Sequence, residues 1–309
     1  MGAKVFIDGE AGTTGLQIRA RLDARDDITL IQLPDDLRKD AGARRDAFAQ
    51  ADVAILCLPD EAARESVALA QDLDVRFIDA STAHRVDPNW VFGLPELGAD
   101  QRAAIQAARF VSNPGCYSTG AILMLAPLVA AGLLPVDWAV SINAVSGYSG
   151  GGKALIGEYQ GGSEPAHFVY ATGQQHKHLP EIMARTGLTR QPIFVPSVGN
   201  FEQGMAVQIP LHLSDLPGAP NMKDLHAALA AHYAGGRFVS VQDLADQESR
   251  IIPTALNDTN RAEISVRGDA ATGRVVLIAV LDNLGKGASG AAVQNLNLMI
   301  GADEGAALS

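Results

Sequence analysis

Residues 4–15 read Lys-Val-Phe-Ile-Asp-Gly-Glu-Ala-Gly-Thr-Thr-Gly, an apolar run of strand length followed at once by three evenly spaced glycines. Gly9, Gly12 and Gly15 form G-x-x-G-x-x-G where the expected helix Thr13–Ala24 opens. Small residues at such a turn let the backbone approach a pyrophosphate, which then lies at the helix N-terminus. The spacing differs by one residue from the commonest fingerprint, and a turn that binds nothing is the alternative. The stretch favours a dinucleotide site.

Strand-like and helix-like patterns alternate through the first half of the chain. The expected strands are Lys4–Asp8, Thr29–Leu33, Val53–Leu58, Arg76–Asp79 and Arg109–Ser112, with helices such as Thr13–Ala24 and Glu61–Asp72 between them. Repeated strand–helix–strand units place their strands parallel, so this half predicts a doubly wound, Rossmann-type sheet of the α/β class.

The pattern changes from about Val136. Longer alternating runs follow at Met205–Leu213, Arg261–Arg267 and Arg274–Asp282, which predict a mixed or antiparallel sheet in a second, α+β domain. The segment Gly287–Ile300 reads as a final helix with an apolar face.

Composition and charge restrict the partners. A formal net charge of -11 argues against a nucleic acid or an anionic membrane, and leaves a small-molecule substrate. The apolar run Ala121–Val136 is interrupted by Pro127 and Pro135 and is short for a membrane span. Two cysteines cannot form a disulfide framework and the N-terminus leaves no room for a signal peptide, so we expect a cytoplasmic protein.

The nonapeptide Ser112–Gly120, SNPGCYSTG, holds the candidate nucleophile. Pro114 and Gly115 predict a turn that places Cys116 at or beside the N-terminus of an apolar helix. The partial positive charge there would lower the pKa of the thiol, and the thiolate could attack a carbonyl to form a thioester. A buried structural cysteine is the alternative for Cys116, and it is the expectation for Cys57 in its apolar strand.

The segment His176–Ile182, HKHLPEI, offers two histidines and a carboxylate. His178 and Glu181 are three residues apart, so at a helix start they would share a face and the carboxylate could orient the imidazole. A solvated polar turn is the alternative. No second Cys/His cluster supplies further ligands, so no metal site is predicted.

Two glycine-rich loops and one missing acid complete the candidates. Ser146–Lys153 could form an anion-binding nest, and Asp282–Gly290 could direct amides at a phosphate or a nicotinamide, although either could be a flexible connection. Leu33–Pro34 occupy the place of the usual ribose-reading acid, with Asp35 and Asp36 slightly beyond and Arg38–Lys39 further on. This arrangement favours a 2′-phosphate and therefore NADP.

Several motifs in combination carry a family resemblance over nearly the whole chain. KVFIDGEAGTTG, FGLPEL, SNPGCYSTG, SGYSGGGK, HKHLPEI, GNFEQGM and LDNLGKGASGAAVQNLN resemble the compact form of the N-acetyl-γ-glutamyl-phosphate reductase family, in the semialdehyde dehydrogenase superfamily. The resemblance implies an NADP-binding Rossmann domain of residues 1–115 with 286–309, and a catalytic and oligomerisation domain of residues 116–285. It also implies NADPH-dependent reduction of an acyl phosphate to N-acetylglutamate 5-semialdehyde in arginine biosynthesis, through a thioester on Cys116.

The same resemblance implies roles for individual residues. His178 is the expected general acid/base, with Glu181 as its orienting group and His176 as the second candidate. The pyrophosphate would contact Gly9, Gly12, Thr13, Thr14 and Gly15; the cofactor would also contact Lys286, Gly287, Gly290 and Gln294; and the substrate would contact Asn113, Arg85 and Lys153. We expect a homo-oligomer, a dimer or tetramer. A reductase of aspartyl or aminoadipyl phosphate and a catalytically silent NADP-binding protein are the alternatives.

Overall fold

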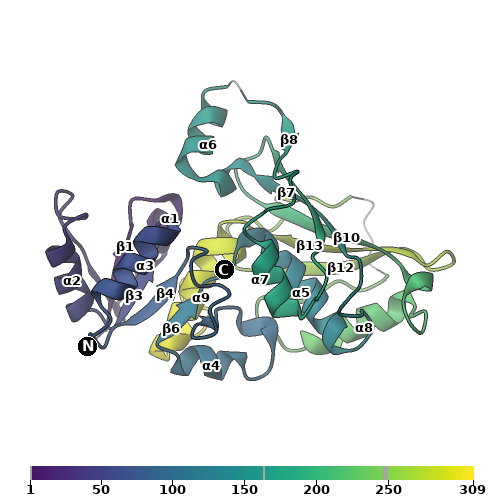
Figure 1. Ribbon diagram of the computed structural model, residues 1–309, viewed down its shortest axis with the longest axis horizontal. Helices are drawn as coiled ribbons and strands as arrows, with labels where there is room; N and C mark the ends of the chain where they lie inside the picture. Colours follow the sequence, from purple (N-terminus) through teal and green to yellow (C-terminus); the bar gives the residue numbers. More distant parts are fainter. Residues whose placement is uncertain (1, 163, 246–249) are drawn as a thin grey trace. The chain divides into compact units, whose positions relative to one another are not determined.

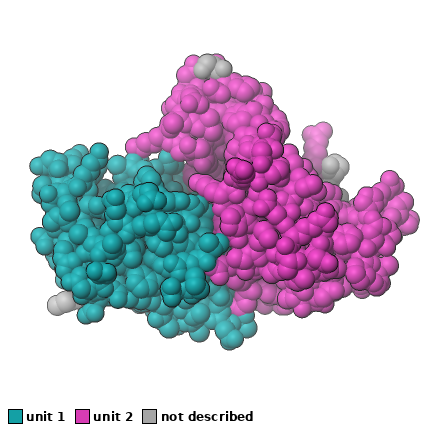
Figure 2. Space-filling view, in the orientation of Figure 1, with its two compact units in different colours: residues 1–95, 99–115, 288–309 teal, residues 96–98, 116–287 magenta. Residues whose placement is uncertain are grey.

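The computed structural model describes residues 2–162, 164–245 and 250–309, and the chain divides into two compact units (Figure 2). Unit 1 comprises Met1–Pro95, Ala99–Gly115 and Ala288–Ser309, and unit 2 comprises Glu96–Gly98 and Cys116–Gly287. Compared with the expected domain ranges, Lys286, Gly287 and the segment Glu96–Gly98 lie in unit 2.

Unit 1 is built on a six-stranded sheet in the order β2-β1-β3-β4-β6-β5, and every neighbouring pair in it is parallel. Its strands are β1 Ala3–Asp8, β2 Ile28–Ile31, β3 Val53–Leu56, β4 Arg76–Asp79, β5 Val91–Phe92 and β6 Phe110–Ser112. The chain leaves β1 in one direction to form β2 and then returns past β1 to form β3. Such a reversal marks the place where ligands bind in doubly wound sheets, at the carboxyl ends of the strands. The Rossmann-type prediction is confirmed.

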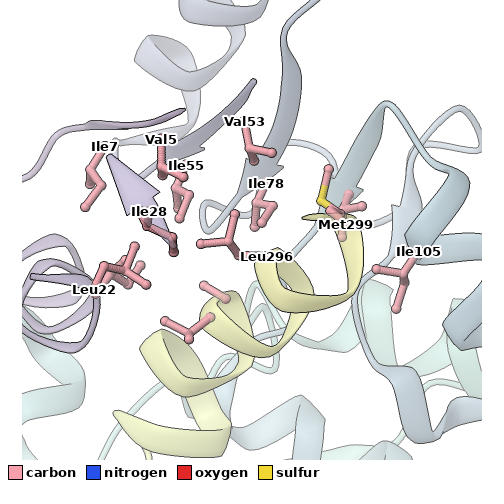
Figure 3. Close-up of a cluster of buried hydrophobic side chains, with 14 residues drawn as sticks. Val5, Ile7, Leu22, Ile28, Val53, Ile55, Ile78, Ile105, Leu296 and Met299 are labelled. Carbon is pink, nitrogen blue, oxygen red and sulfur yellow. The ribbon is translucent and has the colours of Figure 1, made fainter. Parts of the chain in front are cut away.

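Helices cover both faces of this sheet because successive strand residues point to opposite sides. Val5 and Ile7 of β1 face a core that contains Leu296 and Met299 of α9 (Figure 3). Phe6 faces the second core, with Phe48 and Phe77 among its members. The helices of unit 1 are α1 Thr13–Leu22, α2 Ala41–Gln50, α3 Asp60–Leu69, α4 Gln101–Ala107 and α9 Gly290–Ile300, and a 3-10 turn, Pro95–Leu97, follows β5.

Unit 2 contains a seven-stranded mixed sheet in the order β11-β12-β13-β10-β7-β9-β8 (Figure 1). The strands are β7 Ser141–Gly147, β8 His167–Val169, β9 Ile193–Gly199, β10 Met205–His212, β11 Val239–Val241, β12 Ala262–Asp269 and β13 Arg274–Leu281. β11 pairs with β12, and β7 with β9, in parallel; the other pairs are antiparallel. The predicted mixed sheet is therefore confirmed.

The helices of unit 2 are α5 Cys116–Ala130, α6 Gly152–Gln160, α7 Leu179–Thr186 and α8 Met222–His232. α5 is apolar on all sides and almost wholly buried, as expected for a helix enclosed by other elements. A Cβ atom on Gly120 would lie 2.8 Å from a methyl group of Val207, so this glycine lets α5 approach β10 closely. In the parts of the chain that the structure describes, no helix combines the length and apolar character needed to cross a membrane.

The final helix begins later than expected. A π-helical turn, Gly285–Ser289, precedes α9, which starts at Gly290 rather than at Gly287. Turns of this kind are rare and occur frequently at functional sites.

Candidate active site

Cys116 is the first residue of α5, as the turn before it predicted. The first N–H groups of an α-helix have no partner inside the helix, and they carry the positive end of its dipole. Cys116 is partly exposed, whereas the adjacent Tyr117 is buried. The position suits a sulfur that must meet both a positive potential and a substrate.

The residues that precede Cys116 are held inside unit 1. Arg85 donates from Nε to the carbonyl of Asn113 at 3.0 Å, and the Asn113 amide donates to the carbonyl of Ala288 at 2.9 Å. The Asn295 amide, on α9, donates to Asn113 Oδ1 at 3.1 Å and to Gly93 O at 2.9 Å. Arg85 and Asn113, both expected to bind substrate, are thus buried groups that fix the backbone leading to the nucleophile.

The histidine segment lies beside the start of α5, because α7 packs against α5 (Figure 1). The ring of Tyr117 lies 6.0 Å from the ring of His176 and 5.9 Å from that of His178, between centroids. The two imidazoles are 4.6 Å apart. The fold therefore gathers both candidate bases around the residue next to Cys116.

The hydrogen bonds distinguish the two histidines. His176 Nδ1 accepts the backbone N–H of His178 at 3.1 Å, so a neutral His176 carries its proton on Nε2. That Nε2 lies 3.4 Å from the phenolic oxygen of Tyr170. His176 thus supports the backbone on which His178 stands, and His178 is the better candidate for acid/base work.

Glu181 lies near His178, but its Oε1 atom is beyond hydrogen-bond distance of His178 Nε2. The distance from Glu181 Oε1 to His178 Nε2 is 3.9 Å, longer than a hydrogen bond, and both side chains are buried. The carboxylate can still stabilise a protonated imidazole through its charge, because screening by water is weak at a buried pair.

Two phenols adjoin the nucleophile. Burial, together with the neighbouring Cys116, raises the pKa of Tyr170 to about 12. Burial likewise raises the pKa of Tyr117, whose hydroxyl donates to the carbonyl of Ser197 at 2.9 Å. Both phenols are therefore neutral at physiological pH. Tyr170 was not singled out from the sequence, since no local motif marks it.

Cys57 has a different environment. It packs against the core of unit 1, and burial, with the charges of Asp79 and Asp8, raises the pKa of its thiol to about 12. Such a thiol stays protonated and is a poor nucleophile at neutral pH.

The glycine loop after β1 is shaped by close approaches of the backbone. Gly9 has φ +86°, and a Cβ atom there would lie 2.4 Å from the carbonyl oxygen of Cys57. A Cβ atom on Gly15 would lie 2.8 Å from the Cα of Glu10. Gly12 is the N-cap residue of α1, and Thr13 and Thr14 are its first two residues. The loop thus has the form that a pyrophosphate on a helix N-terminus requires.

A cavity of about 450 Å³ adjoins this loop at the carboxyl end of β1. Its lining includes Gly9 and Ala11 of the loop, Leu33, and the basic residues Arg38 and Lys39. Asp8, also in the lining, is paired with Arg44 at 2.7 Å and accepts a hydrogen bond from Ser66 at 2.9 Å. The cavity and its basic rim fit an adenine dinucleotide that carries an additional phosphate.

The remaining expected residues have other environments. The amides of Gly147, Tyr148 and Ser149 donate to the carbonyls of residues 204, 201 and 202, so they do not form the anion nest suggested for Ser146–Lys153. Lys153 is the second residue of α6 and is exposed.

The four expected cofactor residues near the C-terminus are divided between the two units, Lys286 and Gly287 in unit 2 and Gly290 and Gln294 in unit 1. Lys286 is fully buried, with its ammonium on Glu96, and the adjacent Gly287 packs against Cys116. Gln294 donates to Glu304 Oε1 at 2.7 Å. Gly290 begins α9, and the preceding Ser289 donates to Gln17 of α1 at 2.9 Å, so in unit 1 the N-terminus of α9 lies next to α1.

Comparison with known proteins defines the class. Residues 116–283 match the family model "Semialdehyde dehydrogenase, dimerisation domain", and residues 20–106 match "Semialdehyde dehydrogenase, NAD binding domain". Aspartate semialdehyde dehydrogenase II from Vibrio cholerae shares the fold, with a TM-score of 0.71 at 17% identity over 97% of this chain and 98% of that one. The NADP complex of the Candida albicans aspartate semialdehyde dehydrogenase has a TM-score of 0.67 at 16% identity, over 97% and 98% of the two chains. The family models show that the chain belongs to the semialdehyde dehydrogenase class, and the solved structures share its fold.

More similar relatives narrow the class. The N-acetyl-gamma-glutamyl-phosphate reductase of Chelativorans sp. (strain BNC1) is 52% identical over 306 residues, which cover 97% of this chain and 99% of the relative. The Brucella ovis protein of the same name is 50% identical over 309 residues, 97% of this chain and 100% of the relative. The chain belongs to the N-acetyl-γ-glutamyl-phosphate reductase family.

Proposed function

We propose that this protein catalyses the NADPH-dependent reduction of N-acetyl-γ-glutamyl phosphate to N-acetylglutamate 5-semialdehyde, a step of arginine biosynthesis. The observation that carries the proposal is Cys116 at the first position of α5, with the ring of the adjacent Tyr117 6.0 Å from that of His176 and 5.9 Å from that of His178. The full-length similarity to reductases of this name supports the substrate.

The chain's own groups account for the covalent chemistry. The Cys116 thiolate attacks the acyl carbon, the bond to the phosphate oxygen breaks, and inorganic phosphate leaves with the electron pair of that bond. NADPH, when bound, supplies the hydride that reduces the acyl group. His178 Nε2 can take the thiol proton before attack. After hydride addition the C–S bond breaks, the aldehyde leaves, and His178 can return the proton to the Cys116 thiolate, while Glu181 stabilises the imidazolium.

The glycine loop and the cavity beside it are the proposed cofactor site. Gly9, Gly12, Thr13, Thr14 and Gly15 would hold the pyrophosphate at the start of α1. Arg38 and Lys39 would contact the 2′-phosphate, because they line the cavity soon after β2, whereas Arg44, also in the lining, is paired with Asp8.

The reverse reaction tests the substrate. Phosphate-dependent reduction of NADP should be fastest with N-acetylglutamate semialdehyde, compared with aspartate semialdehyde and aminoadipate semialdehyde. Cys116→Ser should abolish turnover and leave NADP binding within ~3-fold, because the loop that binds the cofactor is a separate element. A higher kcat/KM for either other semialdehyde would assign a different acyl phosphate, and activity without phosphate would overturn the acyl-phosphate step.

We further propose that the chain forms a homo-oligomer through unit 2 and acts in the cytoplasm. The match of residues 116–283 to a family model described as a dimerisation domain supports the first point. Light scattering on the purified protein measures the assembly, and a monomer at micromolar concentration would contradict it.

A further inference from the structure

Lys286 occupies an environment in which lysine is rare. Its side chain has no exposed surface, and Glu96, its partner, is 5% exposed. Lys286 Nζ lies 2.8 Å from each carboxylate oxygen of Glu96, and 5.7 Å from the centroid of the Phe238 ring. Removing either charge from such a pair strongly destabilises a protein, because the other charge stays buried and unpaired. The pair therefore constrains the two segments that carry it.

These segments are 190 residues apart in the sequence and differ in structure. Glu96 lies in the 3-10 turn Pro95–Leu97, and its carbonyl accepts a hydrogen bond from His232 Nε2 of α8 at 3.0 Å. Lys286 lies in the π-helical turn Gly285–Ser289. The backbone of Glu96 is thus hydrogen-bonded to α8, and the ion pair of its carboxylate with Lys286 connects the π-helical turn to this segment.

The next residue of the π-helical turn contacts the nucleophile. A Cβ atom on Gly287 would lie 2.8 Å from Cys116 Cβ and 3.2 Å from Cys116 Cα. The Gly287 amide donates to the carbonyl of Asp282 at 2.9 Å, so its backbone is held from the other side as well. The backbone of Gly287 therefore packs directly against the side chain of Cys116, and any residue with a Cβ atom would clash at this position.

We propose that Lys286 and Glu96 are positioning residues, whose ion pair holds Gly287 against Cys116 and so fixes the direction of the sulfur. This role rests on the proposed function, in which Cys116 is the nucleophile. It replaces cofactor binding as the role of Lys286, because the ammonium is buried on a carboxylate rather than presented to a ligand. Misplacement of a reacting atom by about 1 Å can cost ~10²-fold in rate.

The test separates positioning from stability. Lys286→Met should lower kcat by ~10–10²-fold with KM for both substrates within ~3-fold, because a displaced sulfur affects the chemical step rather than binding. It should also change the pH profile of Cys116 alkylation by iodoacetamide, followed by mass spectrometry of the labelled peptide. The double variant Lys286→Met/Glu96→Gln should recover part of the lost Tm without recovering the alkylation profile, since no buried charge is left but the short contact is absent.

Val275→Ala is the matched control, since it truncates a buried residue at the opposite end of β13. It should lower Tm without changing the alkylation profile. Gly287→Ala keeps the ion pair and places a methyl group against Cys116, so it should change alkylation even if Lys286→Met does not fold.

A Lys286→Met protein that resembles Val275→Ala in both readouts would show the pair to be structural only. A rise confined to KM for NADPH would restore the cofactor role. Alkylation needs no substrate, so this arm decides the proposal even if the reductase assay fails.

Discussion

At the residue scale, the histidine segment shows how hydrogen bonds assign roles that residue types leave open. His176 and His178 are both imidazoles near Tyr117, and the sequence offered little to choose between them. In the structure His176 Nδ1 accepts the backbone N–H of His178, whereas His178 Nε2 lies next to a buried carboxylate. The first arrangement supports the backbone, and the second suits proton transfer.

His178→Asn should lower kcat by roughly 10²–10⁴-fold, the usual range for loss of a general acid/base. His176→Asn should cost ~10-fold or less, because an asparagine oxygen can still accept the His178 amide. Steady-state kinetics in the semialdehyde direction measures both effects. The assignment is wrong if His176→Asn is inactive while His178→Asn retains most of its activity.

At the element scale, two glycines in the loop between β1 and α1, Gly9 and Gly12, serve different purposes. Gly9 needs glycine for its positive φ and for the approach of Cys57 O. Gly12 has φ -74°, and a Cβ atom there would lie 3.5 Å from Gly9 O, an ordinary van der Waals contact. The first glycine is required by the fold, and the second is available to a ligand.

Gly9→Ala should lower the free energy of unfolding by ~1–3 kcal/mol, the cost of backbone strain with a steric clash. Gly12→Ala should change that free energy by less than ~1 kcal/mol but weaken NADP binding by ~10-fold or more, since a methyl group would stand where the pyrophosphate approaches. Urea unfolding and calorimetric titration report the two quantities. Unchanged affinity in folded Gly12→Ala would place the pyrophosphate elsewhere.

The basic rim of the cavity next to the same loop should set cofactor preference. Arg38→Ser/Lys39→Ser should reduce the preference for NADPH over NADH by at least ~10-fold, about 1.4 kcal/mol, because a 2′-phosphate would lose its counter-charges. Arg64→Ser is the matched control, since Arg64 is an exposed arginine of α3 outside the lining of the cavity. Equal kcat/KM for NADPH and NADH in the unmodified enzyme would contradict the NADP assignment.

At the scale of the whole molecule, the buried thiol of Cys57 and several buried phenols make the free energy of unfolding decrease at alkaline pH. The pKa of the Cys57 thiol is raised from 9.0 to about 12, and burial also raises the pKa values of Tyr117, Tyr170 and Tyr233. In each case the folded state keeps a proton that the unfolded state releases. Stability is then complete below the unfolded pKa and falls as the pH rises above it.

The free energy of unfolding should therefore decrease between pH 8 and pH 10.5. Cys57 alone should contribute about 1–2 kcal/mol of this loss, because its unfolded thiol ionises over that interval. Cys57→Ala should flatten the dependence and leave turnover intact, while costing ~1 kcal/mol at neutral pH as a small core truncation. Urea unfolding at the two pH values measures the change, and an identical slope in Cys57→Ala would show that this thiol is not the source.

The sequence by itself determined the features that depend on neighbours along the chain. The apolar run of β1 with the glycines after it predicted a strand, a turn and a helix, and Pro114–Gly115 predicted that Cys116 would begin α5. Alternation along β10, β12 and β13 likewise predicted a sheet, since side-chain direction in a strand repeats every two residues.

The tertiary structure decided which polar side chains are available to a ligand. Arg85 and Lys286 have the charge that a phosphate would require, yet the fold buries them on Asn113 O and on Glu96. Tyr170 carries no local signal, and folding brings its phenol close to Cys116 and Tyr117, more than fifty residues earlier in the chain. A buried charge takes whichever partner the packed chain brings within reach, and that partner can lie 190 residues away, where no local pattern records it.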